Sequence, residues 1–259
     1  MIKALFFDID GTLADTETHR MTDPVKNALL KLRGDGKKLF ISTGRHKLEI
    51  EEGTMLGGLE FDGYVLLNGQ YCIAGDTVVH RHPIDPADIA GILKQLQKTP
   101  FPCAFLEADR IYINYVDDYV VAEQAKIAAE IPPVTDIARA LDHDVYQVIP
   151  FIREDQDDLV LASMPHCTIS RWSETVTDVV PARGGKEQGI RKILSHFAIT
   201  QEESMAFGDG GNDITMLRYA GIGVAMGNAR PEVKAAADYI TADIGEDGIC
   251  AALRHFRLI

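Results

Sequence analysis

The sequence of 259 residues carries 26 lysine and arginine side chains against 39 aspartate and glutamate side chains, so its formal net charge is −13. Hydrophobic residues make up 46% of the chain and charged residues 25%, an ordinary globular composition that argues against disorder. Because the chain is acidic and has no basic block, we expect no nucleic-acid partner and no membrane partner. Its apolar runs are far shorter than the roughly 20 residues that span a bilayer.

The start of the chain is too polar and too short in apolar residues for a signal peptide. The four cysteines lie far apart in the sequence, and their spacing predicts neither a zinc site nor a disulfide framework. We therefore expect reduced cysteines in a cytoplasmic protein.

Strands and helices alternate along the first part of the chain. Residues 3–7, 39–41 and 64–67 form short apolar runs that predict buried strands. Helices are expected to begin near Pro24 and near His46. Apolar strands without polar alternation, separated by helices, are typical of a parallel α/β sheet.

The pattern changes after a turn at residues 74–76, which predicts a hairpin. Hairpins separated by helices then indicate an antiparallel α+β unit, and beyond Lys186 the α/β alternation returns with strands at 205–207 and 222–225. Within the α+β unit the predicted helices are 85–97, 117–130 and 154–161, and the predicted strand pairs are 103–107 with 111–115 and 168–172 with 176–180. We therefore expect an α/β fold whose Rossmann-like parallel-sheet core comprises residues 1–81 and 184–259, with an α+β domain of residues 82–183 inserted.

Two pairs of carboxylates directly follow predicted strands of the core. Asp8 and Asp10 follow the first strand, and Asp209 and Asp213 follow the strand at 205–207. In open α/β sheets ligands bind at this edge, although Asp8 and Asp10 alone are also typical turn residues. Four converging carboxylates repel one another unless a cation is present. Oxygen ligands without histidine or thiolate favour a hard ion, and phosphate chemistry favours Mg²⁺.

Positive and hydrogen-bonding groups are expected near the same edge. Thr43 closes the strand at 39–41 and precedes a helix, so its hydroxyl and nearby N–H groups are predicted to hold an anion. Lys186 begins a helix after two glycines and can supply an ammonium to a phosphate, although most lysines are solvated surface residues.

This ordered set of residues resembles the four motifs of the haloacid dehalogenase superfamily. In detail the chain resembles the Cof-type sugar-phosphate phosphatases, whose α/β cap is inserted between the second and third motifs. The residues that carry the resemblance are Asp8-x-Asp10-Gly11-Thr12, Thr43-Gly44-Arg45, Asn68-Gly69, Lys186 and Gly208-Asp209-Gly210-Gly211-Asn212-Asp213.

The resemblance implies a catalytic role for each motif. Asp8 would be the nucleophile that forms an aspartyl-phosphate, and Asp10 would be the general acid and base. Lys186 and Thr43 would bind the phosphoryl oxygens. Mg²⁺ would be held by Asp8, by the backbone carbonyl of Asp10 and by Asp209, with Asp213 in support.

The resemblance also implies a substrate and the residues near it. The partner would be a small phosphorylated metabolite, most simply a hexose phosphate, and the inserted domain would select it. Arg45 is expected to project from the catalytic edge towards the inserted domain, and Asn68 to face the same space. Gly44 and Asn212 complete the residues expected to contact the substrate.

Two other functions stay open at this point. A phosphomutase shares the first chemical step and protects the phosphoenzyme from water. A phosphosugar sensor binds its ligand without turnover, but it has no use for a second carboxylate such as Asp10.

Overall fold

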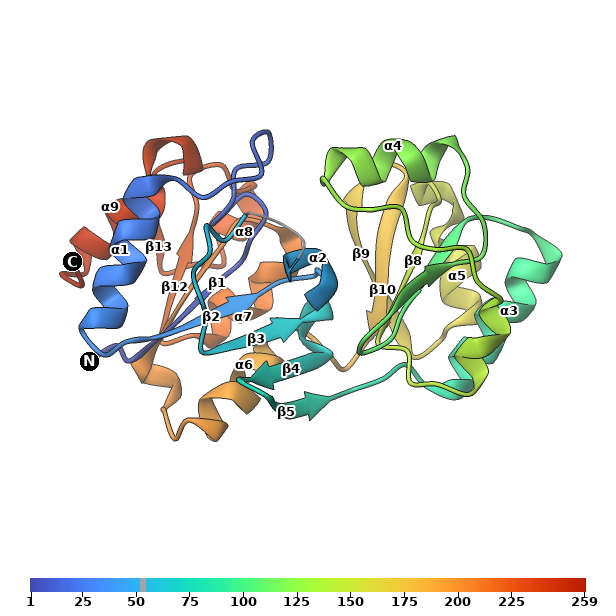
Figure 1. Cartoon of the computed structure of the whole chain (residues 1–259), viewed down its shortest axis with the longest axis horizontal. Coiled ribbons are helices and arrows are strands. Elements are labelled where there is room, and N and C mark those ends of the chain that lie inside the picture. The colour runs from blue at the N-terminus through green and yellow to red at the C-terminus, as the bar shows by residue number, and fades with distance from the viewer. Residues whose placement is uncertain (52–54) are drawn as a thin grey trace. The chain divides into compact units, whose positions relative to one another are not determined.

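The computed structural model describes residues 1–51 and 55–259 (Figure 1). The chain divides into two compact units. Unit 1 comprises Met1–Arg45, Ile50–His80 and Gly185–Ile259, and unit 2 comprises His46–Glu49 and Arg81–Gly184. The catalytic role predicted for residues 1–81 and 184–259, and the substrate-selecting role predicted for 82–183, stay predictions. Within the described residues, no helix has both the length and the apolar character needed to cross a membrane.

Unit 1 is built on an eight-stranded sheet with the order β13-β12-β11-β1-β2-β3-β4-β5. The strands from β13 to β3 pair in parallel, which confirms the predicted parallel core, and β4 pairs antiparallel with β3. At the place of the predicted hairpin, β4 and β5 are neighbours in the sheet and are joined by a turn at residues 75–76. The strands are β1 (Ala4–Phe7), β2 (Lys38–Ser42), β3 (Gly63–Leu66), β4 (Tyr71–Ala74), β5 (Thr77–Arg81), β11 (Ser204–Gly208), β12 (Ile222–Ala225) and β13 (Tyr239–Ile240).

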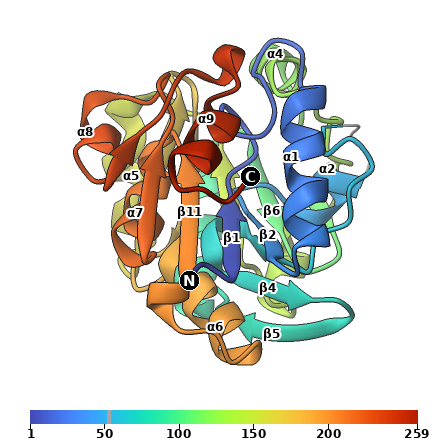
Figure 2. The ribbon, with the colours of Figure 1, turned by 90° about the vertical axis from the view of Figure 1, so that its left-hand side faces the viewer.

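Helices cover both faces of this sheet. Successive strand residues point to opposite faces, so Phe6 stacks on Phe40 on one side, while Phe7 stacks on Phe207 on the other. The face of the sheet that carries Phe6 packs against apolar helix residues, among them Ile190 and Ile193. Figure 2 shows α1 and α9 side by side against the other face. The helices are α1 (Asp23–Gly34), α6 (Lys186–His196), α7 (Ile214–Tyr219), α8 (Pro231–Lys234) and α9 (Gly248–His255), and α2 (Lys47–Glu51) is shared between the two units.

Unit 2 contains a five-stranded sheet with the order β7-β6-β8-β10-β9. All of its pairings are antiparallel, and they include both predicted strand pairs. Its apolar core joins Ile89 and Ile92 on α3 to Phe105 and Val148 on the sheet. The elements are α3 (Pro86–Lys98), β6 (Cys103–Leu106), β7 (Ile111–Ile113), α4 (Asp118–Lys126), β8 (Gln147–Pro150), α5 (Asp157–Ser163), β9 (Cys167–Ser173) and β10 (Val176–Pro181).

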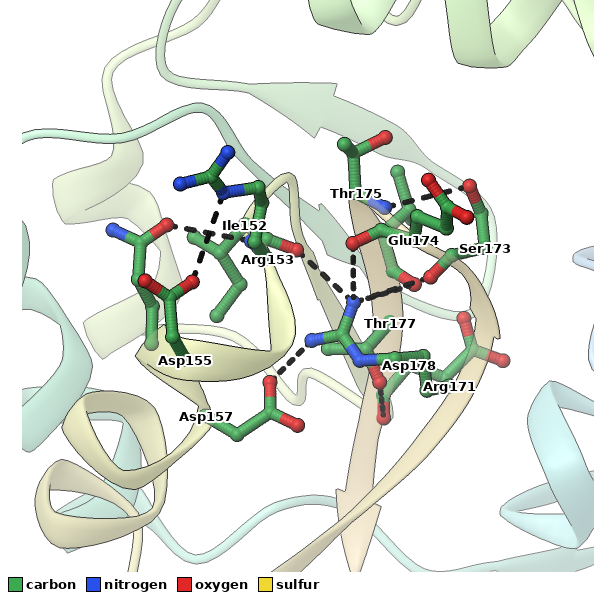
Figure 3. Close-up of polar contacts among 12 residues, drawn as sticks. Ile152, Arg153, Asp155, Asp157, Arg171, Ser173, Glu174, Thr175, Thr177 and Asp178 are labelled. Atoms are coloured by element: carbon green, nitrogen blue, oxygen red, sulfur yellow. Dashed lines mark hydrogen bonds and ion pairs between the residues drawn. The ribbon is translucent and has the colours of Figure 1, made fainter.

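Arg171, on β9, holds the end of the β9–β10 hairpin to the loop before α5 (Figure 3). Its Nη2 donates to the Asp157 carboxylate. Its Nη1 lies 3.0 to 3.4 Å from four backbone carbonyl oxygens, those of Ile152, Ser173, Glu174 and Val176. The guanidinium is therefore committed to the internal structure of unit 2.

The sequence does not predict β8, although this strand lies in the centre of the unit 2 sheet. It begins at Gln147 and ends at Pro150, and a proline within an apolar run argues against a central strand. The predicted helix at 117–130 is also too long: α4 ends at Lys126, and Ala128 has a φ of +50°, which a helix does not accommodate.

Candidate active site

The polar residues predicted to carry chemistry lie at one edge of the unit 1 sheet. Asp8 directly follows β1, Thr43 follows β2, and Asp209 follows β11. These three strands are neighbours in the parallel sheet, with β1 in the middle. Since the carboxyl ends of parallel strands share one edge, the order of the strands brings residues from both ends of the chain together.

Lys186 is completely buried at the start of α6. Its Nζ donates to Asp8 Oδ1 at 2.7 Å and to Asp213 Oδ1 at 2.5 Å. A buried ammonium is tolerated only with such compensation, because burial without a partner costs several kcal/mol, on the order of 3–5. The alternative of a solvated surface lysine is therefore wrong.

Asp213 organises the loop that follows β11. Its Oδ2 accepts hydrogen bonds from the backbone N–H groups of Asp209 at 2.9 Å and Gly210 at 2.8 Å. A Cβ atom at Gly208 would lie 2.6 Å from the Asp213 side chain, so a glycine is required there for this close approach. Lys186 donates to the other carboxylate oxygen of Asp213, and the Asp213 side chain is fully buried.

The site has more negative than positive charge, and the pKa values show it. Burial, together with the nearby Asp213 and Asp209, raises the pKa of Asp8 well above its usual value, although Lys186 acts in the opposite direction. Burial and Asp213 likewise raise the pKa of Asp209 to about 7. Burial lowers the pKa of Lys186, but Asp213 and Asp8 outweigh burial and raise it. One ammonium therefore does not compensate for these carboxylates.

The same carboxylates form a suitable donor set for a metal ion. Asp8, Asp209 and Asp213 each place one carboxylate oxygen within 4.8 Å of the others. The donors are all hard oxygens and their charges are under-compensated, which are the features that a divalent cation such as Mg²⁺ requires. The residues therefore fit the predicted kind of ion.

The turn after β1 is held by residues from two other loops. Thr12 Oγ1 donates to Asp209 Oδ1 at 2.7 Å, and Asn228 Nδ2 donates to the backbone carbonyl of Gly11 at 2.9 Å. Gly11 has a φ of +81°, and a Cβ atom there would overlap the Asp209 carboxylate. A glycine is thus required both by the backbone conformation and by the close approach of Asp209.

Arg45 binds Asp10. Its Nε and Nη2 each donate to one carboxylate oxygen of Asp10 at 2.7 Å, a bidentate ion pair. The Arg45 side chain is 7% exposed, whereas that of Asp10 is 40% exposed. The Arg45 guanidinium thus binds the second carboxylate of the Asp8–Asp10 pair, a partner that the sequence did not predict, and its projection towards the inserted domain stays a prediction.

Thr43 is buried, and its backbone is already bonded. Its N–H donates to the carbonyl of Val65 at 2.9 Å, and its Oγ1 accepts from the N–H of Arg45 at 3.1 Å. The N–H of His46 donates to the Glu49 side chain. These three N–H groups therefore already have acceptors, and the predicted binding of an anion by the Thr43 hydroxyl stays a prediction. Gly44, half-buried, lies between Thr43 and Arg45.

Asn68 and Asn212 are brought together from distant parts of the sequence. Asn212 Nδ2 donates to Asn68 Oδ1 at 2.9 Å. Asn68 is buried in a left-handed conformation, with a φ of +55°. The next residue, Gly69, approaches the Gly185 carbonyl so closely that a Cβ atom would overlap it. This contact places the loop after β3 directly beside the start of α6 and Lys186.

Unit 1 therefore brings predicted residues into three groups, each joined by hydrogen bonds among its members. One is the cluster around Lys186, the second is the Arg45–Asp10 pair, and the third is the Asn68–Asn212 pair. Two contacts were not predicted from the sequence, that of Thr12 with Asp209 and that of Asn228 with Gly11. Thr12 lies in a recognised motif, so a role for it at the site could have been predicted. Asn228 is an isolated asparagine after β12, and no pattern in the sequence indicated its contact.

Comparison with known proteins gives concordant results. Residues 5–253 match the family described as haloacid dehalogenase-like hydrolase. YkrA of Bacillus subtilis, named provisionally as a phosphatase, is 32% identical over 257 residues, covering 99% of this chain and 98% of YkrA.

Two solved structures resemble the chain along its full length. One is the haloacid dehalogenase subclass IIB sugar phosphatase BT4131, with 42% identity, a TM-score of 0.92, and coverage of 99% of this chain and 100% of that one. The other was reported as showing conservation of a trigonal-bipyramidal intermediate in a phosphoryl-transfer superfamily. It has 42% identity and a TM-score of 0.93, and all of both chains is covered.

Proposed function

This chain belongs to the haloacid dehalogenase-like hydrolase family, and on that basis we propose that it is a Mg²⁺-dependent phosphatase of small phosphate monoesters. The proposed substrates are sugar phosphates, in particular hexose phosphates, and the proposed intermediate is an aspartyl-phosphate on Asp8. The similarity to a subclass IIB sugar phosphatase supports the substrate class.

The observation that carries this proposal is the environment of Asp8. A buried ammonium lies 2.7 Å from one of its oxygens, and a second aspartate, Asp10, lies two residues further along, oriented by Arg45. A nucleophilic carboxylate beside a separate, partly exposed acid is the arrangement that phosphoryl transfer in two steps needs.

Asp8 would attack the phosphorus atom in the first step. A bond forms between an Asp8 carboxylate oxygen and phosphorus, while the bond between phosphorus and the sugar oxygen breaks. Asp10 would donate a proton to the departing sugar oxygen. In the second step Asp10 would accept a proton from the water that attacks phosphorus, and the bond from phosphorus to Asp8 then breaks. General acid–base catalysis of this kind contributes about 10²–10⁴ in rate.

The proposed Mg²⁺ ligands are Asp8, the backbone carbonyl of Asp10, and Asp209, with Asp213 holding the loop. Bound Mg²⁺ would offset the negative charge that an incoming phosphate adds to these carboxylates. Asp213 suits a supporting role because Lys186 and two backbone N–H groups already bind its oxygens.

The remaining proposed contacts surround the phosphate and the sugar. Lys186 and the Thr43 hydroxyl would bind phosphoryl oxygens. The substrate-binding residues would be Gly44, Arg45, Asn68 and Asn212. Each carboxylate oxygen has a second lone pair besides the one that faces Arg45, so Asp10 can hold a proton for the substrate without losing Arg45. Unit 2 is proposed to select among sugars.

A panel of phosphate monoesters tests this function. We expect phosphate release from hexose 6-phosphates and p-nitrophenyl phosphate with Mg²⁺, and none after chelation. Acid quenching of an Asp10→Asn variant during turnover of labelled substrate should trap phosphoprotein that hydroxylamine cleaves. Transfer of phosphate to a second hexose phosphate in place of release would indicate a phosphomutase. Binding of hexose phosphates without turnover would indicate a sensor.

A further inference from the structure

The turn after β1 keeps its shape through its own hydrogen bonds. The carbonyl of Ile9 accepts from the N–H groups of Thr12, Leu13 and Ala14, and the N–H of Gly11 donates to the Ala14 carbonyl. These bonds fix the form of the turn but do not tie it to the rest of unit 1. Side-chain hydrogen bonds between the turn and other loops make that attachment.

Besides the Arg45–Asp10 ion pair, two side-chain hydrogen bonds attach the turn to other loops of unit 1. The Thr12 bond reaches Asp209, a proposed metal ligand, so its partner has a second function. Asn228 reaches the turn from the other direction, because its Nδ2 donates to the Gly11 carbonyl at 2.9 Å. Gly11 directly follows Asp10, whose backbone carbonyl and carboxylate both have proposed roles.

The orientation of the Asn228 amide is set by its two backbone partners. Its Oδ1 accepts from the N–H of Ile244 at 3.0 Å, and its Nδ2 donates to the Gly11 carbonyl. An N–H group can only donate and a carbonyl can only accept, so the reversed amide would lose both bonds. The asparagine amide thus supplies, on one short side chain, both the donor and the acceptor that join the two loops.

The two residues directly before Asn228 anchor its loop to the end of β11 and to the loop after β13. The N–H of Met226 donates to the Gly208 carbonyl, and that of Gly227 donates to the Ala242 carbonyl, each at 3.0 Å. A Cβ atom at Gly227 would overlap Asp243, so this glycine allows the loops after β12 and β13 to touch. Asn228 therefore projects from a rigid support.

From these contacts we propose that Asn228 is a positioning residue for the turn that carries Asp8 and Asp10. It would hold the Gly11 carbonyl, and through it the Asp10 main chain, in the orientation that catalysis requires. The effect on rate rests on the proposed phosphatase function, whereas the effect on the turn does not.

The test compares two variants with a matched control. Asn228→Asp keeps an acceptor for Ile244 but cannot donate to Gly11, and Asn228→Ala loses both bonds. Asn27→Asp makes the same change of charge at an exposed asparagine on α1. The readouts are kcat and KM for p-nitrophenyl phosphate at saturating Mg²⁺, and amide hydrogen exchange of metal-free protein in peptides covering 9–14 and 38–42.

We expect both Asn228 variants to lower kcat about tenfold, the equivalent of one lost hydrogen bond, with KM changed less than about twofold. Exchange in 9–14 should be about tenfold faster, with 38–42 unchanged, and Asn27→Asp should match the wild type. Unchanged exchange in 9–14 would overturn the proposal. So would a loss of kcat in Asn228→Asp alone, since added charge would then be the cause. If the wild type hydrolyses no ester, the phosphatase function fails while the exchange data still decide the role of Asn228.

Discussion

Arg45 binds both carboxylate oxygens of Asp10, through Nε and Nη2 at 2.7 Å each. The two residues are held from different strands, since Asp10 follows β1 and Arg45 follows β2. The bidentate geometry fixes the plane of the carboxylate as well as its distance. Arg45 therefore defines the direction from which Asp10 can exchange a proton with a substrate.

Replacing Arg45 by lysine is expected to reduce kcat/KM by about 10- to 100-fold, because an ammonium cannot form the paired hydrogen bonds of a guanidinium. The Mg²⁺ concentration for half-maximal activity should stay unchanged, since Asp10 is proposed to bind the metal through its backbone carbonyl and not through the carboxylate that Arg45 holds. Steady-state kinetics over a range of Mg²⁺ concentrations measures both quantities. Arg254→Lys, at an exposed position on α9, is the control and should behave as the wild type.

Asp8→Asn is expected to abolish turnover, because an amide is not a nucleophile for phosphorus. Asp8 has a raised pKa, so its charged form lowers the stability of the folded protein as pH rises through that pKa. The asparagine has no such charge, and the unfolding midpoint of the metal-free variant at pH 8 should equal or exceed that of the wild type. Residual phosphate release at an appreciable fraction of the wild-type rate would refute covalent catalysis by Asp8.

Metal binding is expected to release protons. Burial and Asp213 raise the pKa of Asp209 to about 7, so this carboxyl is largely protonated at pH 6 and largely ionised at pH 8.5. A cation binds the ionised form, so Mg²⁺ should bind more weakly at pH 6 and displace more protons there. Titration calorimetry in two buffers with different ionisation enthalpies counts the protons. Equal proton release at both pH values would contradict the raised pKa.

Part of the site was predictable because its residues follow apolar strands in a recognisable order. Four carboxylates lie within a few residues of the end of a buried strand, those of Asp8, Asp10, Asp209 and Asp213. Because those strands are parallel neighbours, their carboxyl ends bring the four residues to one edge of the sheet. The pairing of Arg45 with Asp10 was not predictable, since side-chain direction depends on packing around the turn, and sequence spacing does not encode it.

The fold shows the same division between strong and weak signals. Strands β1, β2 and β12 have continuous apolar runs bounded by polar residues, so their positions follow from the sequence. In contrast β8 is defined by its neighbours β6 and β10, which pair with it on either side. Its existence is a tertiary property, as is the contact of Asn228 with Gly11.

Lys186→Met is expected to destabilise the metal-free protein strongly, by about 3–5 kcal/mol at pH 8, because it leaves buried carboxylates without their cation. Chemical denaturation at pH 8 and pH 5.5 measures the effect. The loss should be smaller at the lower pH, because Asp209, with a pKa of about 7, is then largely protonated in the folded state, and the raised pKa of Asp8 acts in the same direction. Lys192→Met, at an exposed position on the same helix, is the control and should change stability little.

Arg171→Met is expected to separate the contributions of the two units to substrate selection. The variant loses the ion pair to Asp157 and the bonds from Nη1 that hold the end of the β9–β10 hairpin (Figure 3). Arg153→Met is the matched control, since Arg153 is 71% exposed and forms one long ion pair, 3.7 Å to Asp155.

We expect Arg171→Met to lower the free energy of unfolding of unit 2 by about 2–4 kcal/mol, as loss of a partly buried polar network does. Hydrogen exchange should rise in peptides from β9 and β10 and stay unchanged in β1 and β2. If unit 2 selects the substrate, the ratio of kcat/KM values among hexose phosphates should fall towards one, while hydrolysis of p-nitrophenyl phosphate changes less than about threefold. A loosened unit 2 with undiminished discrimination among hexose phosphates would show that selection resides in unit 1, where Asn68 and Asn212 are then the first residues to replace.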